Sequence, residues 1–135
     1  MGLVNLPGVA GEICEKICLK HIEVEPKNIL PYVVMGDRFV SGDTPDFANA
    51  FSYYYKAFEI DNNNMAVLKV LLECIEKLPD AAIEKSEKVY GKYIELDPEN
   101  IWPHLIMGDW FLNNKPANYT NAFRYYYRAY EIDDN

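Results

Sequence analysis

The chain has 135 residues, half of them hydrophobic and a quarter charged, which is enough for one domain with a hydrophobic core. Its net charge of -8 disfavours binding to phosphate backbones and favours basic partners. No stretch approaches the roughly 18 apolar residues of a membrane span, and the N-terminus lacks the pattern of a signal peptide. We therefore expect a cytosolic or nuclear protein.

The first predicted element is a single helix over residues 8–24. It carries Cys14 and Cys18, and the third cysteine is Cys74. An odd number of cysteines without a framework spacing indicates reduced thiols, and we expect them to be buried. A metal site would need more ligands than His21 supplies nearby, so we expect neither a metal nor a cofactor.

A long internal repeat follows this helix. Residues 23–61 and 95–133 align without a gap at an offset of 72, with 19 identities in 39 positions. Half of that offset also relates parts of the chain, because Tyr54, Tyr90 and Tyr126 recur at a spacing of 36. The chain is therefore predicted to consist of units of about 36 residues, in which alternate units are more alike than adjacent ones.

Each unit is predicted to contain two helices. In the first, residues 28–41 carry the closely spaced apolar positions of a well-buried helix, and Pro31 is tolerated because it falls in the first turn. Residues 41–45 break the helix, and a second helix is expected over residues 46–60. The polar segment 61–64 ends this helix and can cap the next.

The unit resembles the tetratricopeptide repeat, whose usual period is 34. Its small residue in the first helix matches Gly36 and Gly108, and its aromatic residue three positions later matches Phe39 and Phe111. The alanine, aromatic, alanine series of the second helix is also present. It matches Ala50, Tyr54 and Ala57 in the first unit, and Ala122, Tyr126 and Ala129 in the third. The closing Asp-Pro matches Asp97-Pro98.

The middle unit departs from this pattern. It has Leu72 in place of the glycine, Ser86 in place of the first alanine and Tyr93 in place of the second. The resemblance covers residues 28–135. It implies one all-α domain over residues 1–135, a right-handed α-solenoid of antiparallel helix pairs with about seven helices. Its expected parts are a lone leading helix at 8–24, a first repeat at 28–61, a divergent second at 65–97 and a third at 100–133.

The resemblance also implies a concave groove lined by the first helix of each pair, beginning near Asn28, Asn64 and Asn100. The expected groove residues combine an acidic column, one residue per repeat, with apolar anchors and one lysine. They are Leu30, Val33, Asp37, Lys69, Glu73, Trp102, Leu105 and Asp109. We expect an adaptor or scaffold whose groove binds a basic or amphipathic peptide. This interpretation of the groove has three alternatives. The acidic residues form a solvated face, the acidic column pairs with Lys69 or Lys77, or Trp102 lies in the core.

One subfamily of these repeats grips the acidic C-terminal tails of heat-shock chaperones with lysine, asparagine and arginine side chains. The comparable positions here are Val33, Asp37, Val70, Trp102 and Ile106. Because this clamp is absent and Asp37 would repel a carboxylate, we expect no binding of such tails.

Other functions are less compatible with the residues. His21 and His104 lie in different units, and no nucleophile motif or glycine-rich phosphate loop is present, so we do not expect an enzyme. RNA binding by a helical repeat conflicts with the acidic groove. Self-assembly by stacking of the open ends, into a filament or a closed dimer, is the remaining alternative. Tyr53, Tyr55, Tyr125 and Tyr127 are expected to pack between units rather than to form a binding site.

Overall fold

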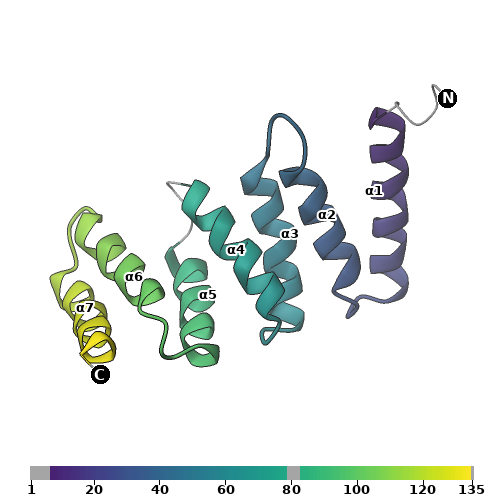
Figure 1. Cartoon of the computed structure of the whole chain (residues 1–135). Coiled ribbons are helices and arrows are strands. Elements are labelled where there is room, and N and C mark those ends of the chain that lie inside the picture. The colour runs from purple at the N-terminus through teal and green to yellow at the C-terminus, as the bar shows by residue number, and fades with distance from the viewer. Residues whose placement is uncertain (1–6, 79–82, 135) are drawn as a thin grey trace. The chain divides into compact units, whose positions relative to one another are not determined.

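The computed structural model describes residues 7–78 and 83–134, and over these residues it is helical with no strand, which confirms the all-α class (Figure 1). None of the described helices is long and apolar enough to cross a membrane. The helices are α1 (Pro7–Val24), α2 (Leu30–Val40), α3 (Phe47–Ile60), α4 (Met65–Lys77), α5 (Ile83–Leu96), α6 (Trp102–Asn113) and α7 (Tyr119–Asp133).

The chain divides into two compact units, Met1–Asp80 with α1 to α4 and Ala81–Asn135 with α5 to α7. The division falls inside the predicted second repeat, residues 65–97, between its two helices. Both of these helices are present, as α4 and α5.

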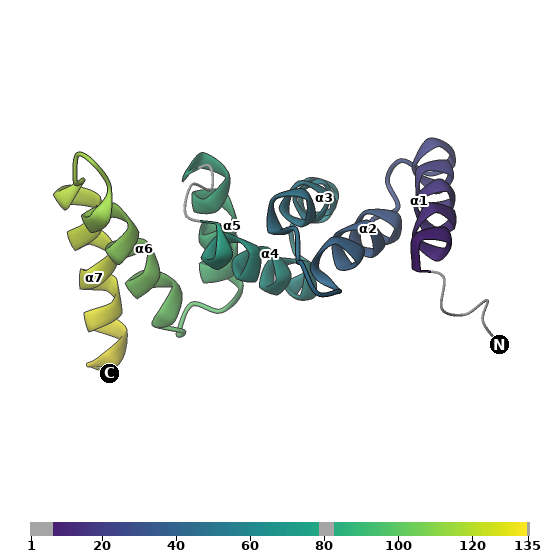
Figure 2. The same ribbon diagram turned by 90° about the horizontal axis from the view of Figure 1, so that it is seen from above.

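In the first unit α2 and α3 form an antiparallel hairpin, with α1 packed on α2 and α4 packed on α3 (Figures 1 and 2). Ala50 and Ala57 on α3 are completely buried, and so are Leu68 and Leu71 on α4. Small residues on α3 allow its neighbours to approach closely, while each buried leucine contributes about 1.5–3 kcal/mol relative to an exposed one.

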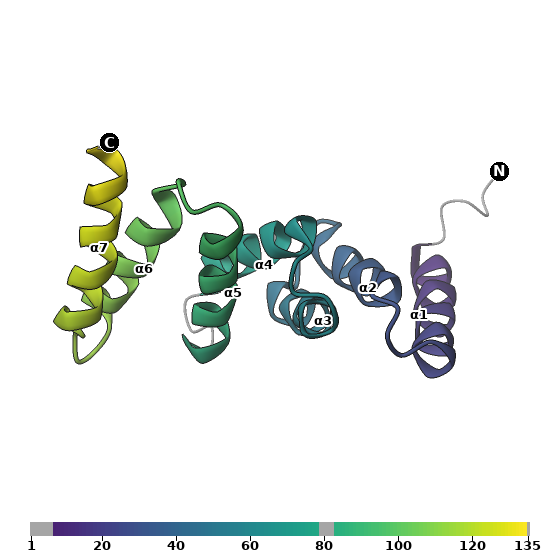
Figure 3. The ribbon, with the colours of Figure 1, turned by 90° about the horizontal axis from the view of Figure 1, so that it is seen from below.

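In the second unit α6 and α7 form the equivalent hairpin, and α5 packs on α6 (Figure 3). The internal repeat is visible in its side-chain packing. Phe39 stacks on Tyr53 with ring centroids 5.7 Å apart, and Phe111 stacks on Tyr125 at 5.8 Å. Tyr53 and Tyr125 therefore pack inside their own hairpins.

The helix starts also repeat at the 72-residue offset. The side chains of Asn28 and Asn100 accept hydrogen bonds from the backbone N–H of Leu30 and Trp102, each at 3.0 Å. The predicted helix over 28–41 therefore begins two residues later, because Asn28 belongs to the turn before it. In the hairpins α2–α3 and α6–α7 the second helix is capped by Asp46 or Asn118, whose side chain accepts from the backbone N–H three residues on.

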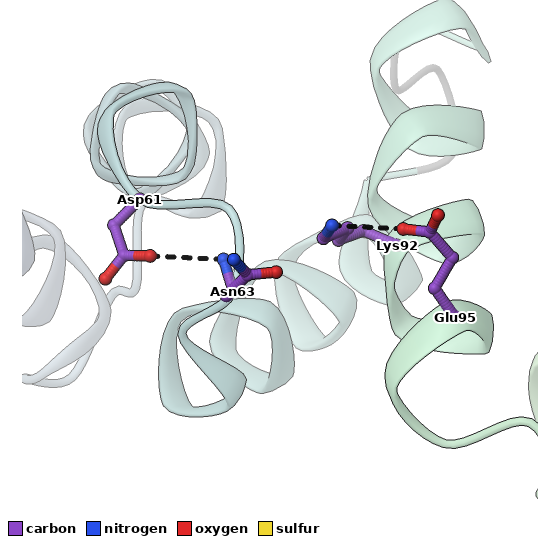
Figure 4. A network of polar contacts seen from close by, with 4 residues as sticks. All are labelled: Asp61, Asn63, Lys92 and Glu95. Carbon is purple, nitrogen blue, oxygen red and sulfur yellow. Dashed lines mark hydrogen bonds and ion pairs between the residues drawn. The ribbon is translucent and has the colours of Figure 1, made fainter.

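The segment after α3 turns the chain into α4. Asp61 accepts a hydrogen bond from the backbone N–H of Asn63 at 3.2 Å (Figure 4). Asn64 then caps α4 by accepting from the backbone N–H of Val67. This agrees with the predicted role of residues 61–64. In the second unit the half-buried Lys92 and the exposed Glu95 form an ion pair at 3.1 Å that joins successive turns of α5. A pair that is partly open to solvent contributes little to stability.

The cysteines are free thiols, and Cys18 and Cys74 are buried as predicted, whereas Cys14 is half-buried. Burial, with a smaller contribution from Glu73, raises the pKa of Cys74 to about 11. Burial and the neighbouring Cys14 also raise the pKa of Cys18. Because the thiolate is the reactive form, both buried thiols are poor nucleophiles at neutral pH.

Replacing either of two glycines in the second unit by alanine is expected to change the free energy of unfolding, in opposite directions. A Cβ at Gly108 would lie within 3.0 Å of the Tyr126 ring, whereas a Cβ at Gly91 would meet nothing within 4 Å. Urea unfolding is expected to give a loss of about 1–3 kcal/mol for Gly108→Ala. Gly91→Ala should gain about 0.5–1 kcal/mol, because alanine restricts the unfolded chain. Equal stabilities of the two variants would contradict the close contact at Gly108.

The buried side chain of His104 is expected to make the protein less stable at acidic pH. It is 3% exposed, and neither ring nitrogen has a hydrogen-bond partner among the described residues. Burial, and then the charge of Arg128, lower its pKa from 6.5. As the pH falls, the imidazole is therefore protonated in the unfolded chain before it is protonated in the folded one. The free energy of unfolding decreases as the pH drops below 6.5, by at most about 1.4 kcal/mol per pH unit. Urea unfolding as a function of pH should show this component in the native chain. His104→Phe should lack this pH-dependent part of the free energy of unfolding. If the free energy of unfolding changed with pH equally in the native chain and the variant, His104 would not be its source.

Candidate peptide-binding surface

Each hairpin holds a tyrosine ring against a glycine on the facing helix. The Tyr54 ring of α3 lies so close to Gly36 of α2 that there is no room for a Cβ, and Tyr126 of α7 lies in the same way against Gly108 of α6. These are the two glycines that match the small residue of the tetratricopeptide pattern. Their role is steric, since a larger side chain would push the tyrosine, and with it the helix, away.

Each of these tyrosines donates a hydrogen bond to the aspartate that follows the glycine. The Tyr54 hydroxyl donates to Asp37 Oδ1 at 2.6 Å, and the Tyr126 hydroxyl donates to Asp109 Oδ1. Burial first, and then the bond to Asp37, raise the pKa of Tyr54 well above its usual range. For Tyr126 the bond to Asp109 is the main cause, and the pKa is raised to about 12. Both tyrosines thus remain neutral donors at neutral pH.

These bonds change the interpretation of the acidic column Asp37, Glu73 and Asp109. All three residues are exposed, on α2, α4 and α6 respectively. In the described residues the partner of Asp37 is a tyrosine hydroxyl rather than Lys69 or Lys77, which are themselves exposed on α4. One oxygen of Asp37 and one of Asp109 are occupied, which leaves the other oxygen of each to face solvent or a ligand.

The apolar anchors lie on the same helices as the aspartates. Leu30 and Trp102, which are equivalent in the repeat, are 62% and 66% exposed. Trp102 is therefore not a core residue, which excludes that alternative. Val33 and Leu105, one helical turn further on, are half-buried. Leu30, Val33 and Asp37 follow one another at i, i+3 and i+7 and share a face of α2.

Trp102, Leu105 and Asp109 repeat this spacing on α6. We call the two sets the α2 strip and the α6 strip. They belong to different compact units, and the first unit also carries Lys69 and Glu73.

Two hollows border these strips. A cavity of about 600 Å³ lies between α1 and α2, and Leu30 forms part of its wall. The other lining side chains are mostly apolar, and they are Ala10, Ile13, Cys14, Ile17, Cys18, His21, Asn28, Pro31 and Val34. In the second unit Leu105 lines a cavity of about 270 Å³ between α6 and α7. An apolar side chain of a ligand could enter either hollow beside a strip.

The expectation that four tyrosines pack between units is wrong for Tyr53 and Tyr125, which stack inside their own hairpins, and for Tyr127. Tyr55 is buried beside Phe51 and Phe58. Its equivalent, Tyr127, is 69% exposed. It belongs to an aromatic face of α7 that sequence reasoning missed. The spacing of these aromatic residues along α7 was visible, but the same residue types 72 positions earlier are mostly buried, so their identity alone could not reveal exposure.

The described residues contain no group of three or more histidine, cysteine or acidic side chains arranged to hold a metal ion. His104 is enclosed in the hairpin of α6 and α7, with its ring 6.3 Å from that of Tyr125. The α2 and α6 strips are made of apolar side chains and carboxylates.

Comparison with protein-family models finds no match, and comparison with curated proteins finds none either.

The pKa of Tyr126 tests the hydrogen bond to Asp109. In Asp109→Ala we expect it to fall from about 12 toward the ordinary value of 10.0, because the bond is its main cause. Carbon-13 NMR of labelled tyrosine rings, assigned with Tyr126→Phe, measures this titration. Glu131→Ala on the exposed side of α7 is the control and should leave it unchanged. Since the folded pKa is raised, the bond's contribution to stability is complete below pH 10 and disappears as the pH rises through about 12. An unchanged pKa in Asp109→Ala would exclude the bond.

Proposed function

We propose that this chain is a tetratricopeptide-like adaptor, in which the helix pairs continue into a right-handed solenoid that binds a segment of another polypeptide. The observation that carries the proposal is the exposure of Leu30 and Trp102 at equivalent positions of the repeat. A large apolar side chain in water has no benefit for folding, whereas a buried tryptophan often dominates the energy of an interface. The resemblance of the repeats supports the solenoid.

The preferred ligand is a basic or amphipathic peptide. Each strip combines an exposed apolar side chain with a carboxylate two turns further along the helix, and the chain carries a net charge of -8. Asp37 and Asp109 each retain one oxygen outside the tyrosine bond. A lysine or arginine of the ligand could donate to that oxygen while a neighbouring apolar side chain contacts Leu30 or Trp102. Acidic chaperone tails would be repelled. Under this proposal the chain acts by binding, without catalysis.

Selection from a random peptide library on the whole chain tests this proposal. We expect selected peptides to carry lysine or arginine beside large apolar residues, and their affinity to fall as salt is added. For one such peptide, measured by calorimetry, Trp102→Ala should weaken binding by about 30-fold, the equivalent of about 2 kcal/mol. Asp109→Asn should weaken it by about tenfold, since it removes the charge but keeps an oxygen that can accept from Tyr126.

Glu131→Gln removes one negative charge outside the α6 strip and is the matched control. If it weakened binding as much as Asp109→Asn, the effect would come from net charge alone. Enrichment of acidic C-terminal peptides, or affinities indifferent to Trp102 and Asp109, would contradict the proposal.

A further inference from the structure

One face of α7 exposes a continuous row of aromatic side chains. Its members, which we call the α7 stripe, occur at i, i+4, i+8 and i+11 and therefore lie along one side of the helix. They are Tyr119 (61% exposed), Phe123 (61%), Tyr127 (69%) and Tyr130 (65%). A contiguous apolar patch of this kind is typical of an interaction site.

The same stripe occurs on α3, where it is covered. The equivalent positions, 72 residues earlier, are Phe47, Phe51, Tyr55 and Phe58. The last three are only 8%, 6% and 7% exposed, and apart from its hairpin partner α2 the helix that packs on α3 is its successor α4. The chain thus contains two copies of one receptor surface, and in one of them the occupant is in place.

The occupant in the first unit is an amphipathic helix of defined chemistry. The buried side chains of α4 are aliphatic or thiol groups, namely Val67, Leu68, Leu71 and Cys74. Apart from Ala66, its exposed side chains are charged, namely Lys69, Glu73, Glu76 and Lys77. Its first turn is capped by Asn64. An apolar face with charged residues opposite is what a helix needs to lie on an aromatic surface while its other side stays in water.

The second unit has hollows along its stripe. One, of about 390 Å³, is lined by Tyr126, Tyr127 and Tyr130. The other, of about 270 Å³, includes Leu105, Ala129 and Tyr130. Ala57 and Phe58, the equivalents of Ala129 and Tyr130, are buried in the first unit. The hollows therefore coincide with positions that the first copy of the repeat buries.

We propose that the hairpin of α6 and α7 binds, on its α7 stripe, an amphipathic helix of another polypeptide with the chemistry of α4. Small aliphatic side chains of the ligand pack on Phe123, Tyr127 and Tyr130, and its charged face remains in solvent. This site goes beyond the strip that carries the proposed function. The stripe lies on α7 and the strip on α6, and in the described part of the chain the two meet only at the hollow that Leu105 and Tyr130 line together.

A second copy of the chain is the less suitable occupant. The apolar faces it could offer include the α7 stripe itself, which is the receptor surface, and that of α1, where Val9, Ile13 and Ile17 are about half exposed. In the 36-residue register α1 is the equivalent of α3 and α7 rather than of α4, because Cys18 aligns with Tyr54. In the repeat, α1 therefore corresponds to the helices α3 and α7 that carry the receptor surface, and not to a helix that packs on it.

The experiment uses the α4 segment itself as the probe. A fluorescently labelled peptide of residues 61–78 is titrated into the whole chain under reducing conditions, and its anisotropy is measured. We expect saturable binding, weakened at least about tenfold by the double variant Phe123→Asp, Tyr127→Asp. Both residues are exposed, so the variant should fold, and circular dichroism checks this.

Matched controls exist on both sides of the contact. Arg124→Ser, outside the stripe, introduces the residue that α3 has at the equivalent position, Ser52, and should leave the affinity unchanged. A peptide with Leu68→Asp and Leu71→Asp should not bind, whereas one with Lys69→Ala and Glu73→Ala on its outer face should bind as well as the original.

Three outcomes would overturn the proposal. If the folded double variant bound the peptide with unchanged affinity, the peptide would instead be displacing α4 from α3. If the peptide bound neither chain, the α7 stripe would not accept such a helix. If light scattering over a dilution series showed self-association that the double variant removes, and the peptide did not compete with it, the occupant would be a second copy.

Discussion

The contact between a tyrosine ring and a glycine on the facing helix governs both hairpins. Gly36 and Gly108 leave room for the rings of Tyr54 and Tyr126, and this sets how closely the paired helices approach. The same ring position brings each hydroxyl to the aspartate beside the glycine. The carboxylate therefore faces outward from a helix whose neighbouring apolar positions are already half-buried. Packing and surface chemistry in each hairpin thus depend on one steric condition.

Much of the helical pattern was predictable, because it depends on residue spacing. The helix starts at Asn64 and Asp46 and the break after residue 40 follow from capping and periodicity. The bonds from tyrosine to aspartate were not predicted. The hydroxyl of a tyrosine can reach several hydrogen-bond acceptors. Which acceptor it meets depends on how the ring is oriented between two helices, and residue spacing does not define that orientation.

Exposure was the least predictable property of the candidate site. Phe51 and Phe123 are the same residue at equivalent positions, yet one is 8% and the other 61% exposed. Tyr55 and Tyr127 differ in the same way. Local sequence determines that these residues lie on one side of a helix, but burial depends on whether another helix packs there. A repeat protein makes this distinction visible, because it presents the same face with and without a neighbour.

The tyrosine bonds also have a consequence for the entropy of binding. A surface aspartate normally rotates among several conformations, and a ligand that fixes one of them loses part of the interaction energy, about 0.5–1.5 kcal/mol for a flexible side chain. Tyr54 already restrains Asp37 by a bond of 2.6 Å, and Tyr126 restrains Asp109. Their free oxygens are accordingly preorganised. A cationic side chain that binds these oxygens therefore has a smaller entropic cost than it would at an ordinary acidic surface.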